Sequence, residues 1–102
     1  RLYNRGKAIT DPALVIYYSK NRAGICRIGI TTSKKIGNAV ERNHSRRLLR
    51  EAFRSVCPSV KPQYDIVIVA RSKTKYVKST RLAEIMMNIF EREGMLIAES
   101  DE

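Results

Sequence analysis

The sequence has 102 residues and carries 20 Lys and Arg against 10 Asp and Glu, which gives a formal net charge of +10. This length is typical of one compact domain, and the hydrophobic share of 43% suffices for a small core and argues against a wholly disordered chain. No run approaches the roughly 20 apolar residues that span a bilayer, and the N-terminus shows no apolar stretch typical of secretory signals. We therefore expect a cytoplasmic protein.

The charge is unevenly distributed along the chain. Residues 1–83 hold 19 basic and 4 acidic side chains, whereas residues 84–102 hold 1 basic and 6 acidic side chains. Such an excess indicates a polyanionic partner, a phosphate polymer before an anionic membrane surface, and it places the functional surface in residues 1–83. We assign a single domain to residues 1–97 and expect the acidic residues 98–102 to be frayed.

Two strands are predicted in the first third of the chain. Residues 13–18 form a β-branched and aromatic run after a turn signal at residues 10–12, and residues 25–32 form a second such run. The connection between them is short and contains Gly24, so we expect an antiparallel hairpin.

Two helices and a third strand follow. Residues 38–56 predict a helix, with Asn38 as N-cap and Glu41 in capping-box spacing. Residues 64–70 are too few for a good helix and rich in Ile and Val, which predicts a central strand. Residues 79–93 carry one clean apolar stripe at helical spacing. The order β-β-α-β-α predicts an α+β fold, a two-layer α-β sandwich whose small mixed sheet includes a parallel strand.

The cysteine and histidine content is low. Cys26 and Cys57 are the only cysteines and His44 is the only histidine. A zinc site needs about four N or S ligands, so no metal site is assigned. We expect both cysteines to be packed or half-buried free thiols, not a disulfide scaffold.

The helix predicted over residues 38–56 has arginine as its main polar component. At about 100° per residue, one narrow stripe of this helix is formed by Asn43, Arg47, Arg50 and Arg54. A purely solubilising face is one alternative, but it would mix in more acidic i,i+4 partners. A membrane-surface helix is another, but the sheet needs the apolar side. Arginine favours forked recognition of phosphate.

A glycine stands beside lysines just ahead of this helix. Residues 33–39 read Ser-Lys-Lys-Ile-Gly-Asn-Ala, and a helix N-terminus with such a loop can hold a phosphate. The glycine spacing and the Lys-Ser/Thr ending of a nucleotide P-loop are absent. The backbone phosphate of a polymer therefore fits this loop better than a nucleotide does.

The predicted strands offer a second surface. Alternation places Tyr17 on one face of the first strand, and Arg27, Gly29 and Thr31 on one face of the second. A tyrosine beside an arginine, with a glycine clearing space, suits an extended single-stranded nucleic acid. A tyrosine that caps the edge of the core is the alternative, and the pattern alone leaves both open.

No catalytic constellation is visible. The acidic side chains of residues 1–83 are Asp11, Glu41, Glu51 and Asp65. No pair of them looks placed for general acid–base chemistry or for two metal ions, and His44 has no evident carboxylate partner. We assign no catalytic residue, and a self-sufficient nuclease is disfavoured.

Residues 33–54 resemble the signature of the bacterial ribonuclease P protein component, whose core pattern is Lys-x-Gly-x-Ala-Val-x-Arg-Asn-x-x-Lys/Arg-Arg-x-x-Arg. The matching positions are Lys35, Gly37, Ala39, Val40, Arg42, Asn43, Arg46, Arg47 and Arg50. The resemblance extends to residues 3–7, an aromatic-x-x-Gly-Lys segment, and to residues 66–71, a strand followed by arginine.

The resemblance implies a fold and a function. The fold is an α-β sandwich with a left-handed β-α-β crossover, contrary to the usual right-handed rule. The family carries an N-terminal helix before the position of Tyr3, so we expect a fold without this helix and one unassigned wall of its cleft. The function is to assist a catalytic RNA that removes the 5′ leader from precursor tRNA. The RNA performs the Mg²⁺-dependent hydrolysis, and the protein binds no cofactor of its own.

The resemblance also implies partners and site residues. The partners are the ribonuclease P RNA and the precursor tRNA leader, with no membrane and no obligate protein partner. With Arg54 of the same stripe added, the side facing the ribozyme consists of Lys34, Lys35, Arg42, Asn43, Arg46, Arg47, Arg50 and Arg54. With Arg27 and Arg71 added to two matching aromatic positions, the leader cleft consists of Tyr3, Tyr17, Arg27 and Arg71. The alternative function is that of a general basic RNA-binding or ribosomal structural protein without a role in tRNA processing.

Overall fold

The computed structural model of the chain describes residues 6–22 and 24–97, and for Lys34 the backbone alone. The described strands and α-helices are, in chain order, β1 (Lys7–Thr10), β2 (Leu14–Lys20), β3 (Arg27–Thr31), α2 (Ala39–Val56), β4 (Tyr64–Ala70) and α3 (Ser79–Arg92). Short 3-10 turns lie between them at η1 (Lys34–Ile36), η2 (Cys57–Ser59) and η3 (Thr74–Tyr76). The predictions for Tyr3 and for a frayed tail at residues 98–102 lie outside the described residues.

The strands form one mixed sheet in the order β1-β2-β4-β3. β4 is antiparallel to β2 and parallel to β3, so the predicted central strand and the predicted parallel pairing are both confirmed. β3, α2 and β4 thus form the β-α-β unit that holds the crossover. The left-handed sense of this crossover stays a prediction from the resemblance.

The predicted hairpin between β2 and β3 is wrong, because β4 lies between them. β4 is largely apolar on both faces, which is typical of a strand in the interior of a sheet. An interior strand has a neighbouring strand on each side, and β4 has β2 and β3. The six residues 21–26 reach up to about 20 Å, twice the roughly 10 Å between next-but-one strands. The Asn21 amide holds this connection between β2 and β3 in place, since it donates to the Ile25 carbonyl and to the Asp65 carboxylate, both at 2.9 Å. A short connection with a glycine is therefore compatible with either arrangement.

β1 is a strand that sequence reasoning missed. It pairs antiparallel with β2 from Lys7 opposite Tyr18 to Thr10 opposite Val15. The turn between them is closed by Asp11, whose carboxylate accepts the Ala13 N–H at 2.9 Å. With only two apolar residues among four, β1 carries too weak an alternation to stand out. The predicted β-β-α-β-α order is confirmed for the other five elements.

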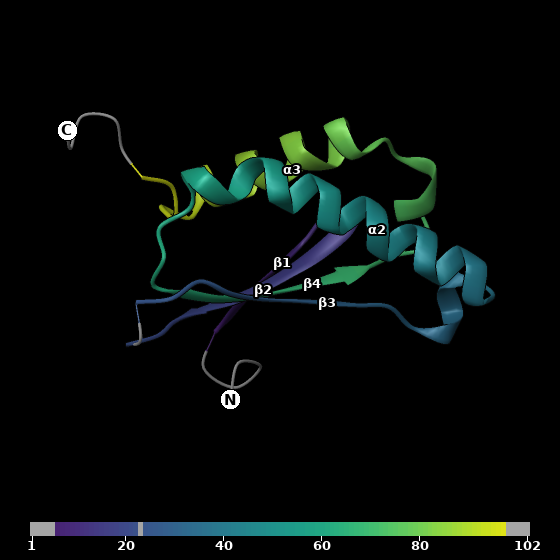
Figure 1. Cartoon of the computed structure of the whole chain (residues 1–102), viewed down its shortest axis with the longest axis horizontal. Coiled ribbons are helices and arrows are strands. Elements are labelled where there is room, and N and C mark those ends of the chain that lie inside the picture. The colour runs from purple at the N-terminus through teal and green to yellow at the C-terminus, as the bar shows by residue number, and fades with distance from the viewer. Residues whose placement is uncertain (1–5, 23, 98–102) are drawn as a thin grey trace.

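Both helices cover the same face of the sheet and lie side by side (Figure 1). The core between the two layers contains the side chains that alternation directs to this face of β2 and β4, which are Leu14, Ile16, Ile66 and Ile68. On the helix side, Phe53 of α2 meets Phe90 of α3 edge to face, with ring centroids 6.4 Å apart. The two-layer α+β sandwich is confirmed.

The helix ends follow the local signals in the sequence. At the start of α2, the Asn38 side chain accepts the Glu41 N–H at 2.9 Å and the Glu41 carboxylate accepts the Asn38 N–H at 3.0 Å. This is the predicted capping box. Pro58 stands just beyond α2, within η2. Gly94 takes a φ of +75° after α3.

Both cysteines are free thiols and half-buried, as predicted. Cys26 precedes β3 and Cys57 follows α2, and both pack against the edge of the core. Burial, together with the neighbouring Cys57, raises the pKa of the Cys26 thiol, so Cys26 is protonated near neutral pH.

Candidate nucleic-acid interface

One side of α2 presents a continuous arginine surface to solvent. Its buried side chains, which the sheet and α3 hold in place, are Ser45, Leu49, Ala52, Phe53 and Val56. Packing of these residues fixes the rotation of the helix about its axis. The opposite stripe is therefore directed outward, and all four of its members, Asn43, Arg47, Arg50 and Arg54, are exposed. We refer to these four residues as the arginine stripe.

Two further arginines flank the stripe and are oriented by hydrogen bonds. Arg46 donates to the Asn43 side chain at 3.1 Å and to the Thr32 hydroxyl at 3.3 Å. Arg42 donates to the Gly37 carbonyl at 2.9 Å. Each guanidinium has five N–H donors, so both arginines retain donors for a phosphate while their planes are already held. Both side chains are half-buried, unlike the members of the stripe.

The connection from β3 to α2 is built around Gly37. Its φ of +144° lies in a region that side chains rarely adopt, and a Cβ at this position would overlap the Glu41 carboxylate. The same carboxylate is the capping-box acceptor described above. Lys35 is exposed in this connection, next to Lys34 in η1. Both predicted lysines therefore lie in the chain just before the N-terminal end of α2.

Lys75 of η3 also reaches this connection, and sequence reasoning missed it. Its ammonium donates to the Ile36 carbonyl at 3.0 Å and forms an ion pair with Glu41 at 3.2 Å. The Asn38 N–H and, after it, Lys75 lower the pKa of the Glu41 carboxyl. No sequence signal identifies this contact, because it joins positions about 40 residues apart through the tertiary fold.

The second predicted surface is the sheet face opposite the helices, which no described element covers (Figure 1). Strand register places Tyr17 opposite Val67, and Val67 opposite Gly29. Arg27 and Thr31 flank Gly29 on the same face, so the predicted sharing of one face is confirmed. Because β4 intervenes, Tyr17 is one strand away from the β3 residues and not beside them.

Adjacent tyrosines on β2 point to opposite sides of the sheet. Tyr18 is buried under the helices, donates to the Glu93 carboxylate at 2.6 Å and meets Tyr64 edge to face. Burial and the Glu93 carboxylate raise the pKa of the Tyr18 phenol well above its ordinary value. Tyr17, by contrast, is half-buried on the open face, among the half-buried valines Val15, Val67 and Val69.

Arg27 and Arg71 lie near opposite ends of this open face. Arg27 is opposite Asp65 at the start of β4 and forms an ion pair with it at 2.9 Å. Arg71 follows the last residue of β4, and its guanidinium donates to the Asp11 carbonyl at 3.3 Å. Six residues of strand separate positions 65 and 71, which is about 20 Å. The open face thus has an apolar centre with one cation toward each end.

The two surfaces meet along the edge strand β3. Ile28 points toward the helix layer but is 42% exposed, because α2 covers β3 only in part. Between them lies a recess of about 280 Å³, lined by Ile28, Ile30, Arg50 and Phe53. On the other side, a shallow hollow of similar size includes Arg27 and Gly29. The arginine stripe and the open face are therefore neighbours across one strand.

Three of the four acidic side chains in residues 1–83 have structural partners. Asp11 closes the β1–β2 turn, the Glu41 carboxylate accepts from the Asn38 N–H in the capping box, and Asp65 accepts from Asn21 and Arg27. Within residues 6–22 and 24–97, no group of three or more His, Cys, Asp and Glu could hold a metal ion. His44 is exposed on α2. Among residues 1–83, these three carboxylates thus have structural roles, and Glu51 is exposed among arginines.

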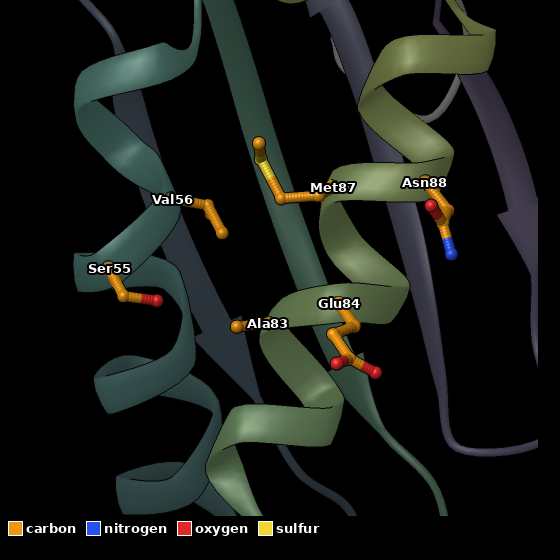
Figure 2. Close-up of a pocket in the computed structure, with 6 residues that line it drawn as sticks. All are labelled: Ser55, Val56, Ala83, Glu84, Met87 and Asn88. Atoms are coloured by element: carbon orange, nitrogen blue, oxygen red, sulfur yellow. The ribbon is translucent and has the colours of Figure 1, made fainter.

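A further hollow is lined by residues of the two helices. It has a volume of about 430 Å³, and Figure 2 shows it between α2 and α3, with Val56, Ala83 and Met87 directed into the gap. Ser55, Glu84 and Asn88 complete its lining, and none of the predicted site residues contributes.

Across the described residues, neither helix is both long and apolar enough to span a bilayer.

Comparison with known proteins gives a consistent result. A family model described as Ribonuclease P matches residues 1–94. The ribonuclease P protein component of Clostridium novyi is 38% identical over 97 residues, which cover 93% of this chain and 86% of that protein. The corresponding protein of Clostridioides difficile is 38% identical over 98 residues, covering 95% and 86%.

Solved structures show the same similarity in three dimensions. The RNase P protein of Staphylococcus aureus superposes with a TM-score of 0.79 at 28% identity, covering 95% of this chain and 89% of that one. The RNase P protein of Thermotoga maritima superposes with a TM-score of 0.78 at 28% identity, covering 89% and 86%.

Proposed function

Since the chain belongs to the ribonuclease P family, as the protein component of a tRNA-processing endoribonuclease, we propose that it contributes two RNA-binding surfaces to that enzyme. The arginine stripe and the loop before α2 bind the ribonuclease P RNA. The open face of the sheet binds the 5′ leader of precursor tRNA. Both bindings take place in the cytoplasm.

The observation that carries the ribozyme-side assignment is the rotation of α2. The core holds this helix so that its arginines form one exposed strip, and the capping box fixes where the strip begins. Guanidinium groups bind phosphate oxygens in a forked geometry. RNA backbone contacts of this kind position a protein without reading sequence. A folded RNA with closely spaced phosphates is the partner that such a surface fits.

The leader assignment is supported by the arrangement of the open face. Single-stranded nucleic acids bind where aromatic and apolar side chains receive the bases and flanking cations receive the backbone. Tyr17 with its valine neighbours offers the first, and Arg27 and Arg71 offer the second. The Arg27–Asp65 ion pair is largely exposed, with 64% of the Arg27 side chain accessible. Such a pair contributes only about 0–1 kcal/mol, so a phosphate can compete for Arg27 at little cost.

Hydrolysis on this proposal is a property of the RNA subunit with its own Mg²⁺, and the protein holds no cofactor. The carboxylates of Asp11, Glu41 and Asp65 accept hydrogen bonds that hold the fold, which supports the assignment of hydrolysis to the RNA. The protein's contribution is then to bind and orient two RNA segments relative to each other.

Binding selectivity tests the proposal against the general RNA-binding alternative. Filter binding at several salt concentrations should show tighter binding to a bacterial ribonuclease P RNA than to an unrelated structured RNA of the same length. Equal affinity for the two RNAs at every salt concentration would favour a general RNA-binding protein.

A further inference from the structure

Lys75 is the one described lysine whose ammonium contacts both a backbone carbonyl and a carboxylate across the tertiary fold. It comes from η3, beyond the end of β4, and its side chain is only 15% exposed. Its two partners, the Ile36 carbonyl and the Glu41 carboxylate, lie on either side of Gly37. Lys75 therefore bridges the loop before α2 and the first turn of α2.

The two carboxylate oxygens of Glu41 contact different partners. Oε1 accepts the Asn38 N–H at 3.0 Å, and Oε2 pairs with the Lys75 ammonium at 3.2 Å. Gly37 makes this approach possible, because any side chain at this position would occupy the space of the carboxylate. The carboxylate thus contacts the Asn38 backbone and Lys75 at once, while Lys75 also contacts the Ile36 carbonyl.

The lysines of this loop would be repelled by the N-terminus of α2 if Glu41 were absent. Lys34 and Lys35 stand next to the N-terminus of α2, where the helix dipole is positive and repels cations. Glu41 in the first turn offsets part of this repulsion, and Lys75 keeps Glu41 turned toward the loop. The Gly37 carbonyl in the same loop accepts from Arg42. The position of the loop therefore also sets the position of the first arginine of α2.

We propose that Lys75 is a positioning residue for ribonuclease P RNA binding. Its contacts with Ile36 and Glu41 hold the loop before α2 in one conformation, so that Lys35 and Arg42 are presented in register with the arginine stripe. This inference rests on the proposed function. Lys75 itself does not contact the RNA, since its ammonium is already engaged within the protein.

The central variant is Lys75→Met, which keeps the apolar stem and removes the charge. Lys73→Ala is the matched control, because Lys73 is an exposed lysine two residues away. Glu41→Gln and the double variant form a thermodynamic cycle with Lys75→Met. Lys75→Arg should keep the affinity of the wild type, because a guanidinium can reach both partners. Affinity for ribonuclease P RNA is measured over a series of salt concentrations, with amide hydrogen exchange of residues 36–42 alongside.

A loop that must be ordered on binding weakens affinity by roughly three- to tenfold. We expect this loss in Lys75→Met, with an unchanged salt slope, faster exchange of the loop amides and recovery in Lys75→Arg. Glu41→Gln should cause a similar loss, and the double variant no more than either one. If Lys75→Met folds poorly, Glu41→Gln and Lys75→Arg answer the same question.

Two results would overturn the inference. An affinity for Lys75→Met equal to that of Lys73→Ala would leave Lys75 with a purely structural role. A salt slope lower by about one, with losses additive to those of Glu41→Gln, would make Lys75 a direct phosphate contact. Should the wild-type protein show no preference for ribonuclease P RNA, the proposed function fails. The hydrogen exchange data would then still decide whether Lys75 orders the loop.

Discussion

At the scale of single residues, position in the strand decides which side of the sheet a tyrosine faces. Tyr17 and Tyr18 are adjacent in sequence, yet Tyr18 is buried with its hydroxyl bound to Glu93 and Tyr17 lies on the open face. Alternation alone predicts that they point to opposite sides. It does not say which side the helices cover, and this is why the sequence left the role of Tyr17 open.

Tyr17→Ala is expected to weaken binding of precursor tRNA to the holoenzyme by about 1–3 kcal/mol, the range for a base stacked on an aromatic ring. Binding of mature tRNA, which has no leader, should be unchanged. Fluorescence titration of both RNAs measures the difference. Tyr18→Phe is the control, since it should lower stability without changing either affinity. Equal losses for both RNAs in Tyr17→Ala would make Tyr17 a core residue.

Gly37→Ala is expected to lower stability more than Gly24→Ala. Both glycines have a positive φ, for which a side chain costs about 1–2 kcal/mol. At Gly24 an added Cβ meets nothing, whereas at Gly37 it displaces the Glu41 carboxylate from the capping box. Loss of such a cap adds about 0.5–2 kcal/mol. Urea denaturation of both variants provides the comparison, and equal losses would show that the capping box contributes little.

At the scale of elements, α2 shows how far local sequence determines a site. The capping box, the apolar positions and Pro58 are all close in sequence, and they predicted the helix to within one residue at each end. The direction of the arginine stripe followed from the same periodicity. Pairing of the strands was not predictable in this way, because it depends on which residues of distant segments bury each other. The hairpin error and the Lys75 contact both have this origin.

Arg47→Ala in α2 should weaken ribonuclease P RNA binding and make its salt slope shallower by one unit at most, because one phosphate contact is lost. Arg81→Ala in α3 removes the same charge from an exposed arginine that is paired with Glu84. It should leave the slope unchanged. If the two variants behave alike, the effect of Arg47 is one of net charge and not of contact.

The N-terminus of α2 should also show a pH dependence. The Asn38 N–H and Lys75 lower the pKa of Glu41 below its ordinary value of 4.5. A lowered pKa in the folded state means that the stabilisation is present above pH 4.5 and is lost as pH falls through the folded pKa. The difference in unfolding free energy between wild type and Glu41→Gln should therefore shrink below pH 4.5. A constant difference from pH 7 to pH 3 would contradict this.

At the scale of the whole molecule, the fold leaves two neighbouring surfaces that no described element covers. The helices cover one face of the sheet, the opposite face carries no described element, and the arginine stripe adjoins that face across β3 (Figure 1). Composition showed that the positive charge lies in residues 1–83, and the fold shows that its helical part is exposed as one strip. Periodicity predicted the exposed stripe of α2, and alternation predicted the face that Tyr17 shares with residues of β3. The roles of these residues in binding RNA stay predictions. The separation of Tyr17 from the residues of β3 by β4 became visible only in three dimensions.

Reconstituted leader cleavage tests the central claim most directly. A bacterial ribonuclease P RNA is assayed on precursor tRNA at low Mg²⁺, with the wild-type protein, Arg47→Ala, Arg81→Ala or no protein. We expect the wild type and Arg81→Ala to stimulate cleavage strongly, Arg47→Ala to require a higher protein concentration, and the protein alone to cleave nothing. Absence of stimulation by the wild-type protein, or cleavage by the protein without RNA, would contradict the proposed role.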